Sequence, residues 1–217
     1  LVNEGNIIEA ADLCHSTNSL PEVCGRVCPQ DRLCEGACTL NDGFGAVTIG
    51  SVEKYITENA WNEGWIKPIK VTKEKTQSIG IIGAGPAGLA CGEQLRNKGY
   101  KISIYDRYDR PGGLLIYGIP NFKLEKYVVQ RRTNLMREGG IEFIQNFEVG
   151  ENATLEELRK KHDAILIATG VYKSREIETV GDKLENIFPA MAFLTASNRK
   201  GLGDEVKLFD RGILNSE

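Results

Sequence analysis

The sequence predicts an α/β fold in which a parallel, Rossmann-like sheet follows a small α-helical region. Strand-like apolar segments alternate with helical segments from residue 78 onward, which is the order that builds a parallel sheet. A glycine-rich turn, Gly83-Ala-Gly85-Pro-Ala-Gly88, connects the first strand of this part to its first helix. Residues 1–66 lack strand-like alternation, and four of the chain's six cysteines lie between Cys24 and Cys38.

The overall composition is that of an ordinary globular protein, with 41% apolar and 26% charged residues among 217. A net charge of −3 gives no sign of nucleic-acid binding, and no apolar run reaches the roughly 18 residues of a membrane helix. The chain starts at Leu1 within a helical pattern and has no signal-peptide features. We therefore expect a fragment of a cytoplasmic protein whose cysteines stay reduced.

Residues 1–66 are expected to form a helical, iron–sulfur-type domain. Val47, Ile49, Val52 and Ile56 recur at helical spacing, and the apolar content is low enough that a metal site would be needed for stability. The spacing Cys-x3-Cys-x5-Cys-x3-Cys reads most simply as one four-cysteine site, holding a cluster or, with a poorer fit, zinc.

A lysine-rich stretch at residues 67–77 is typical of a solvated linker, and we place the domain boundary there. A basic patch for an acidic partner is the alternative. Residues 78–217 are then expected to form a truncated Rossmann-like domain that binds FAD or NAD(P). Its predicted strands cover residues 78–82, 101–105, 141–147 and 163–169; its predicted helices cover 87–98 and 124–138, start at Thr154 with a capping box to Glu157, and cover 189–198.

The glycine turn has the features of a pyrophosphate site at a helix N-terminus. Gly83 lets the chain turn out of the strand, Gly85 leaves room for phosphates, and Gly88 allows the helix to pack closely on the strand. Asp106 follows eighteen residues after Gly88, at the end of the second strand, where a carboxylate accepts hydrogen bonds from ribose hydroxyls. A tight turn without a ligand is the alternative.

Two later features favour FAD over NAD. A double glycine ending at Gly113 follows Asp106 closely, and the strand ending near residue 169 is followed by Gly170, so backbone could approach a long, extended cofactor at both places.

Together these segments resemble the small subunit of NADPH-dependent glutamate synthases, a family related to the amino-terminal part of dihydropyrimidine dehydrogenase and to bifurcating ferredoxin:NADP oxidoreductases. The resemblance rests on the glycine turn and on three further motifs: LPEVCGRVCPQDRLCEGAC at 20–38, IG at 49–50 before Glu53, and GIPNFKLEK at 118–126. It implies an oxidoreductase in which NADPH reduces FAD, and two [4Fe–4S] clusters carry electrons to the large subunit.

The resemblance also implies roles for individual residues. Cys28, Cys34 and Glu53 would ligate one cluster and Cys38 the other, while Cys24, like Cys14 and Cys91, would be a plain buried thiol. The expected FAD contacts are Gly83, Gly85, Pro86, Ala87, Gly88, Asp106, Arg107, Gly113, Leu114, Lys123, Val149 and Gly170. Lys123 could instead be a surface lysine and Val149 a packing residue.

The chain departs from the family pattern at both ends. The family has four more cysteine ligands before the position of Leu1, and a second glycine turn for NADPH after that of Glu217. We therefore expect no complete cluster pair and no turnover from this chain alone. The alternatives are a related ferredoxin:NADP or dihydropyrimidine dehydrogenase-type enzyme, for which glutamate rather than glutamine at position 53 argues weakly against the pyrimidine type, and a non-catalytic scaffold. His15 and His162 are expected to be structural, and Trp61 and Trp65 to be packing residues.

Overall fold

A four-stranded parallel sheet forms the centre of the computed structural model, which describes residues 1–173, 175, 179–180, 184 and 187–207. The strands β1 (Ser78–Ile82), β2 (Lys101–Tyr105), β3 (Ile141–Ile144) and β4 (Ala164–Ile167) lie in the order β3-β2-β1-β4. Ile81 of β1 is in register with Ile104 of β2 and Leu166 of β4. This order is that of a mononucleotide-binding Rossmann half, so the predicted fold class is confirmed.

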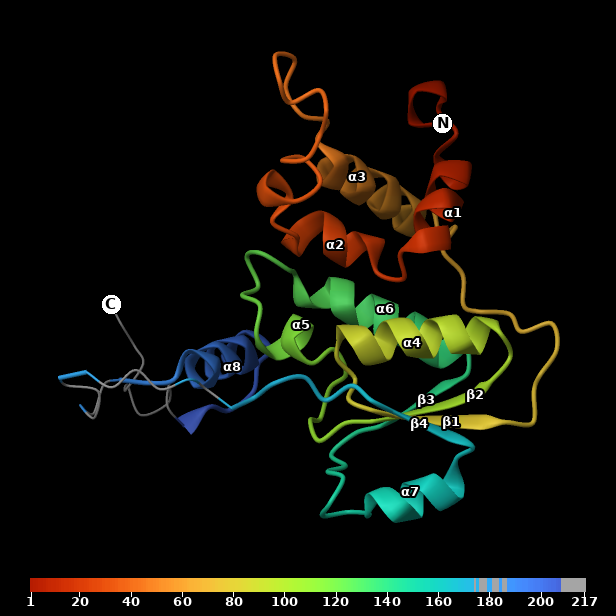
Figure 1. The fold of residues 1–217 in the computed structure, drawn as a ribbon, viewed down its shortest axis with the longest axis vertical. Coiled ribbons are helices and arrows are strands. Elements are labelled where there is room, and N and C mark those ends of the chain that lie inside the picture. The colour runs from red at the N-terminus through yellow and green to blue at the C-terminus, as the bar shows by residue number, and fades with distance from the viewer. Residues whose placement is uncertain (174, 176–178, 181–183, 185–186, 208–217) are drawn as a thin grey trace.

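Helices cover both faces of this sheet. α4 (Pro86–Asn97) and α6 (Lys126–Glu138) lie on one face, and α7 (Leu155–Lys161) lies on the other (Figure 1). Ile81 and Ile104 of the sheet are fully buried together with Val128 of α6, because the β-branched residues of adjacent strands pack against the apolar side of the helix.

The amino-terminal region is helical, as predicted, and consists of η1 (Val2–Glu4), α1 (Ile7–Thr17), α2 (Pro21–Val27), η2 (Gln30–Arg32) and α3 (Ile49–Asn62). Of the residues predicted to form a helical apolar stripe, only Ile56 on α3 is buried, whereas Val47 before the helix and Ile49 and Val52 on it are exposed. Leu20 and Val23, at the start of α2, belong to the same core cluster as the sheet. The helical region therefore sits on the outer side of α4 and α6 (Figure 1).

Residues 63–77 connect the two regions without helix or strand, and the exact domain boundaries remain a prediction. The predicted capping box is present, since the Thr154 side chain accepts from the Glu157 amide and the Glu157 carboxylate accepts from the Thr154 amide. β3 and β4 end earlier than predicted. In β3, the chain leaves the strand towards Asn146, which has a positive φ of 53°. In the described part of the chain no helix is long and apolar enough to cross a membrane.

Two helices after β2 shape the edge of the sheet near the glycine turn. α5 (Leu114–Tyr117) is a single turn that the sequence did not predict, and α8 (Ala190–Gly201) starts one residue later than predicted and runs three residues further. α5 packs against α8, where the Asn198 side-chain amide donates to the carbonyl oxygen of Tyr117 at 3.0 Å. α8 thus lies against the connection that follows β2.

Candidate cofactor-binding site and cysteine region

The glycine turn has the geometry of a phosphate-binding loop. Gly83 has a φ of 110°, and a Cβ atom there would lie 2.4 Å from the carbonyl oxygen of Ala168. A Cβ at Gly88 would lie 1.9 Å from the carbonyl oxygen of Gly83, because the first turn of α4 packs directly on the turn. In contrast, a Cβ at Gly85 would meet nothing within 4 Å. The turn is tightly packed at both ends and open in its middle.

The open space at Gly85 lies at the N-terminus of α4. Gly85 is the N-cap residue, Pro86 is the first helical residue, and Ala87 and Gly88 complete the first turn. The first amides of a helix have no partner within it, and the helix dipole is positive at this end, so an anion is stabilised there. A pyrophosphate group fits the donor set that these residues present.

The carboxylate of Asp106 is buried beside the turn, with 8% of the residue exposed. Its Oδ2 accepts from the main-chain amide of Ala84 at 2.6 Å, and its Oδ1 accepts from that of Tyr108 at 2.9 Å. A carboxylate has about four acceptor positions, so the two amides fix its orientation and leave capacity for the hydroxyl groups of a ribose.

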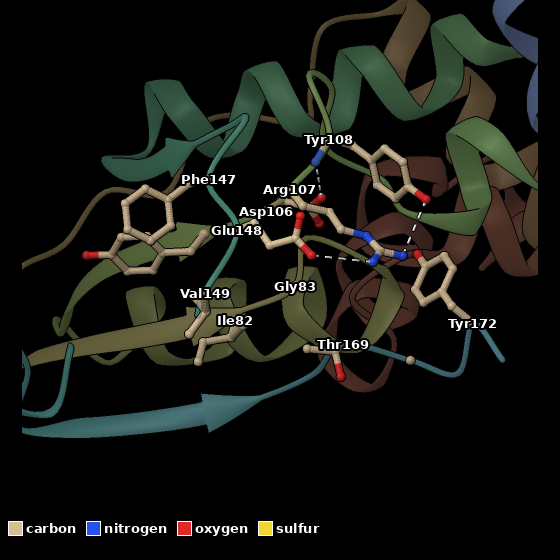
Figure 2. A pocket seen from close by; sticks show the side chains of 12 residues that line it. Ile82, Gly83, Asp106, Arg107, Tyr108, Phe147, Glu148, Val149, Thr169 and Tyr172 are labelled. Atoms are coloured by element: carbon tan, nitrogen blue, oxygen red, sulfur yellow. Dashed lines mark hydrogen bonds and ion pairs between the residues drawn. The ribbon is translucent and has the colours of Figure 1, made fainter. Parts of the chain in front are cut away.

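A cavity of about 330 Å³ opens next to Asp106, at the carboxyl ends of the strands (Figure 2). Parallel sheets bind nucleotides at this edge. The cavity is lined by Gly83, Asp106, Arg107, Val149 and Gly170, all expected from the sequence, and also by Ile82, Tyr105, Tyr108, Phe147, Glu148, Thr169 and Tyr172.

Tyr108 and Tyr172 are lining residues that sequence reasoning missed. The guanidinium carbon of Arg107 lies 4.2 Å from the ring centroid of Tyr172 and 5.1 Å from that of Tyr108. The pKa of Tyr172 is raised because the ring is partly buried. Only its position two residues after Gly170 could have pointed to Tyr172, since the surrounding sequence has no periodic pattern.

The chain that follows the cavity-lining residues 105–108 runs alongside the glycine turn. The amide of Gly112 donates to the carbonyl oxygen of Ala84 at 2.8 Å, and a Cβ on Gly113 would lie 2.8 Å from the Cα of Gly85. Leu114, which begins α5, is 43% exposed. Lys123 is exposed on the loop before α6 and is not among the residues that line the cavity.

Five of the six cysteines lie in the amino-terminal helical region, and none of the six lines this cavity; Cys91 lies on α4. Cys24 on α2 donates from its thiol to the Asn18 side-chain oxygen at 3.6 Å, and the Asn18 amide donates to Glu53 at 2.9 Å. Burial raises the pKa of the Cys24 thiol, and the nearby Cys28 and Glu53 add to that rise. Burial also raises the pKa of the Glu53 carboxyl group.

Of the three predicted cysteine ligands, Cys28 is the C-cap residue of α2, and Cys34 and Cys38 lie on the segment that follows it. Cys34 is exposed. At Cys38, hydrogen bonds with the main chain of Val47 and of Leu40 lower the pKa of the thiol. Within the described residues, no three His, Cys, Asp or Glu side chains come together as a group that could hold a metal ion. The residues present therefore do not assemble a cluster site by themselves, and the predicted ligand set stays a prediction.

Two known protein families match separate parts of the chain. Residues 1–65 match the family described as dihydropyrimidine dehydrogenase domain II, 4Fe-4S cluster. Residues 81–138, from β1 through α6, match the NAD(P)-binding Rossmann-like domain family.

Several glutamate synthases resemble the chain over almost its whole length. The small chain of the NADPH enzyme of Azospirillum brasilense is 56% identical over 217 residues, which is 100% of this chain and 45% of that protein. The corresponding Escherichia coli protein is 49% identical over 203 residues, covering 94% of this chain and 43% of its own length. The NADH enzyme of Saccharomyces cerevisiae is 44% identical over 94% of this chain, but over only 9% of its own length.

Among solved structures, Mycobacterium tuberculosis FprA in complex with NADPH aligns with a TM-score of 0.52 and 21% identity, covering 57% of this chain and 29% of FprA. That likeness supports the fold alone. The sequence identities, together with the family match of residues 1–65, carry the relationship. The chain is thus a homologue of the glutamate synthase small chains, and it spans a little under half of the length of the bacterial relatives described here.

Proposed function

We propose that this chain binds the adenosine diphosphate half of FAD within an NADPH-dependent oxidoreductase of the glutamate synthase type. The observation that carries the proposal is the open position at Gly85, at the N-terminus of α4, in a turn whose first glycine, Gly83, lines the same cavity as Asp106. A pyrophosphate at the turn and a ribose at Asp106 would occupy adjacent parts of one site.

The chain's own residues bind and orient in this proposal. The amides at the start of α4 hold the phosphates, the Asp106 carboxylate accepts from the ribose, and the rings of Tyr108 and Tyr172 flank the adenosine end together with Arg107. Bound FAD would supply the conversion of two-electron into one-electron transfer. No step requires a general base or nucleophile from the described residues.

The wider role follows from the relatives. In the whole protein, electrons would pass from NADPH through FAD and [4Fe–4S] clusters to the glutamate-forming large subunit, in the cytoplasm. Cys28, Cys34, Cys38 and Glu53 are proposed as cluster ligands from the family resemblance. Because the described residues assemble no metal site, we assign the chain itself no step at a cluster.

The test is direct binding. The purified chain is titrated with ADP and with FAD in a calorimeter, and its absorbance is recorded after anaerobic purification together with its iron and zinc content. Binding of ADP and a flavin band at roughly 450 nm support the proposal. A colourless chain that binds neither ligand would instead favour a non-catalytic scaffold.

A further inference from the structure

The segment from Gly112 to Ile119 lies directly against the glycine turn. Its first residue donates to Ala84 at 2.8 Å, and Gly113 approaches Gly85 so closely that a side chain there would collide with the turn. The segment therefore borders the space in which a pyrophosphate would sit.

The helix in this segment cannot hold its position by itself. α5 has four residues, and the hydrogen bonding of a single helical turn does not offset the conformational entropy lost when the turn forms. Its position depends on tertiary contacts, which bury Leu115, Ile116 and Tyr117 and leave Leu114 exposed. The exposed Leu114 directly follows Gly113, the residue that approaches Gly85.

A lysine on α6 anchors the end of this segment. The ammonium group of Lys126 donates to the carbonyl oxygen of Leu115 at 3.0 Å and also to that of Ile119. The Lys126 amide donates to the Asn121 side chain at 3.1 Å, which fixes the loop between α5 and α6. Both ends of the segment are thus tied down, one at the glycine turn and the other at α6.

Lys126 is an unusual choice for a purely structural contact. Only 6% of the residue is exposed, and burial lowers the pKa of its amino group to about 8. Its two described hydrogen bonds go to neutral carbonyl groups, whereas a buried charge is ordinarily compensated by an opposite charge. An apolar side chain of similar length could fill the same space without that desolvation cost, but it could not hold two carbonyl groups in fixed directions.

We infer that Lys126 is a positioning residue that holds the Gly112–Ile119 segment, and Leu114 with it, against the flavin half of the bound cofactor. The inference rests on the proposed function, since it concerns the part of FAD that ADP lacks. Lys123, the lysine that the sequence suggested for this region, is exposed and has a different position from the buried Lys126.

The experiment compares ADP and FAD binding by the whole chain and its Lys126→Met variant. FAD affinity is expected to fall about tenfold in the variant, while ADP affinity stays within about twofold of the original. Amide hydrogen exchange of residues 113–119 is expected to speed up in the ligand-free variant. Lys160→Met, an exposed lysine on α7, is the matched control and is expected to change neither affinity.

Each other outcome is decisive. Equal losses of ADP and FAD affinity, or no loss of either, would overturn the inference. If the original chain binds both ligands equally tightly, the segment makes no useful flavin contact and the inference fails while the proposed function stands. If it binds neither, the proposed function itself fails. Should Lys126→Met not fold, Lys126→Arg retains the charge but not the ammonium geometry, and an unchanged ratio of FAD to ADP affinity in it would reject the role.

Discussion

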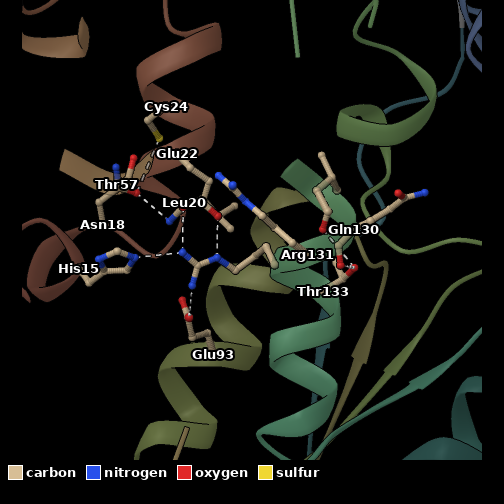
Figure 3. Close-up of polar contacts among 12 residues, drawn as sticks. His15, Asn18, Leu20, Glu22, Cys24, Thr57, Glu93, Gln130, Arg131 and Thr133 are labelled. Atoms are coloured by element: carbon tan, nitrogen blue, oxygen red, sulfur yellow. Dashed lines mark hydrogen bonds and ion pairs between the residues drawn. The ribbon is translucent and has the colours of Figure 1, made fainter. Parts of the chain in front are cut away.

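Arg132 and Glu22, which are 110 residues apart in the chain, form a buried ion pair with hydrogen bonds of 2.6 and 2.8 Å between α6 and α2. The same guanidinium group contacts Glu93 on α4 at 3.2 Å and His15 on α1 at 3.0 Å (Figure 3). One side chain thus joins the helix that bears Cys24 to the helix that starts at the glycine turn. The two regions are held in a defined relative position by this contact.

Neutralising Glu22 is expected to destabilise the fold strongly. Arg132 is 2% exposed and Glu22 is fully buried, so Glu22→Gln removes the main opposite charge from a buried guanidinium group. The expected loss in the free energy of unfolding is about 3–5 kcal/mol, measured by urea denaturation. Glu156→Gln, which breaks an exposed ion pair with Arg159, is the control and is expected to cost less than about 1 kcal/mol.

The pair is also expected to be strongly non-additive. Replacing both Glu22 and Arg132 by Met removes both charges, so the double variant is expected to lose less stability than the two single variants combined. Additive losses would mean that the two side chains stabilise the fold independently of each other.

Substitution of Gly85 is expected to separate binding from folding. Gly85 has an ordinary φ of −76° and open space at its Cβ position, so Gly85→Val leaves the fold intact but fills the proposed phosphate site. ADP affinity is expected to fall at least about tenfold, with an unchanged urea midpoint. Gly201→Val, at an equally open position on α8, is expected to bind ADP normally. Unchanged ADP affinity in Gly85→Val would place the ligand elsewhere.

The stability of the protein is expected to decrease below about pH 6.5, in part because of His162. This imidazole is buried between the Tyr105 hydroxyl group at 2.8 Å and the Ser78 hydroxyl group at 3.2 Å. Its pKa is lowered by burial and then by the charge of Lys161. In the unfolded chain the histidine pKa is about 6.5, so below this pH the unfolded chain binds a proton more readily than the folded chain does. The free energy of unfolding therefore falls as the pH drops.

Urea denaturation at about pH 7.5 and about pH 5.5 tests this effect. His162→Gln is expected to show a smaller loss of stability between the two pH values than the original chain. Some loss remains in the variant, because burial lowers the pKa of His15 as well. A pH dependence that is identical in both proteins would show that His162 is equally easy to protonate in the folded and unfolded states.

The elements that could be predicted are those with local signals. β1 and β2 have the predicted bounds because each is a short apolar run rich in β-branched residues. Thr154 is the N-cap residue of α7 because its capping box is formed within four residues. The roles of Gly83 and Gly88 in packing also follow from the motif, since each contacts residues next to the turn or at the end of a neighbouring strand.

The features that could not be predicted depend on contacts that are distant in sequence. α5 is too short to show a helical period in its apolar residues. In the structure, the side-chain amide of Asn198 on α8 donates to the carbonyl oxygen of Tyr117, the last residue of α5. Likewise, nothing in the local sequence distinguishes the buried Arg132 from its neighbour Arg131. Lys126 is buried and Lys123 is exposed, and this difference depends on how α6 packs against the rest of the fold.

The cysteines provide a last prediction, which tests the ligand assignment in the full-length protein. The family resemblance makes Cys34 a cluster ligand and leaves Cys24 as a plain thiol. In the structure, Cys34 is exposed on its loop, whereas Cys24 is half-buried and its thiol donates a hydrogen bond to the side-chain oxygen of Asn18. Cys34→Ala is therefore expected to lower the iron content measured after anaerobic purification, and Cys24→Ala is expected to leave it unchanged. Equal iron loss in both variants would instead indicate a single site formed by all four cysteines from Cys24 to Cys38, because each would then be a ligand.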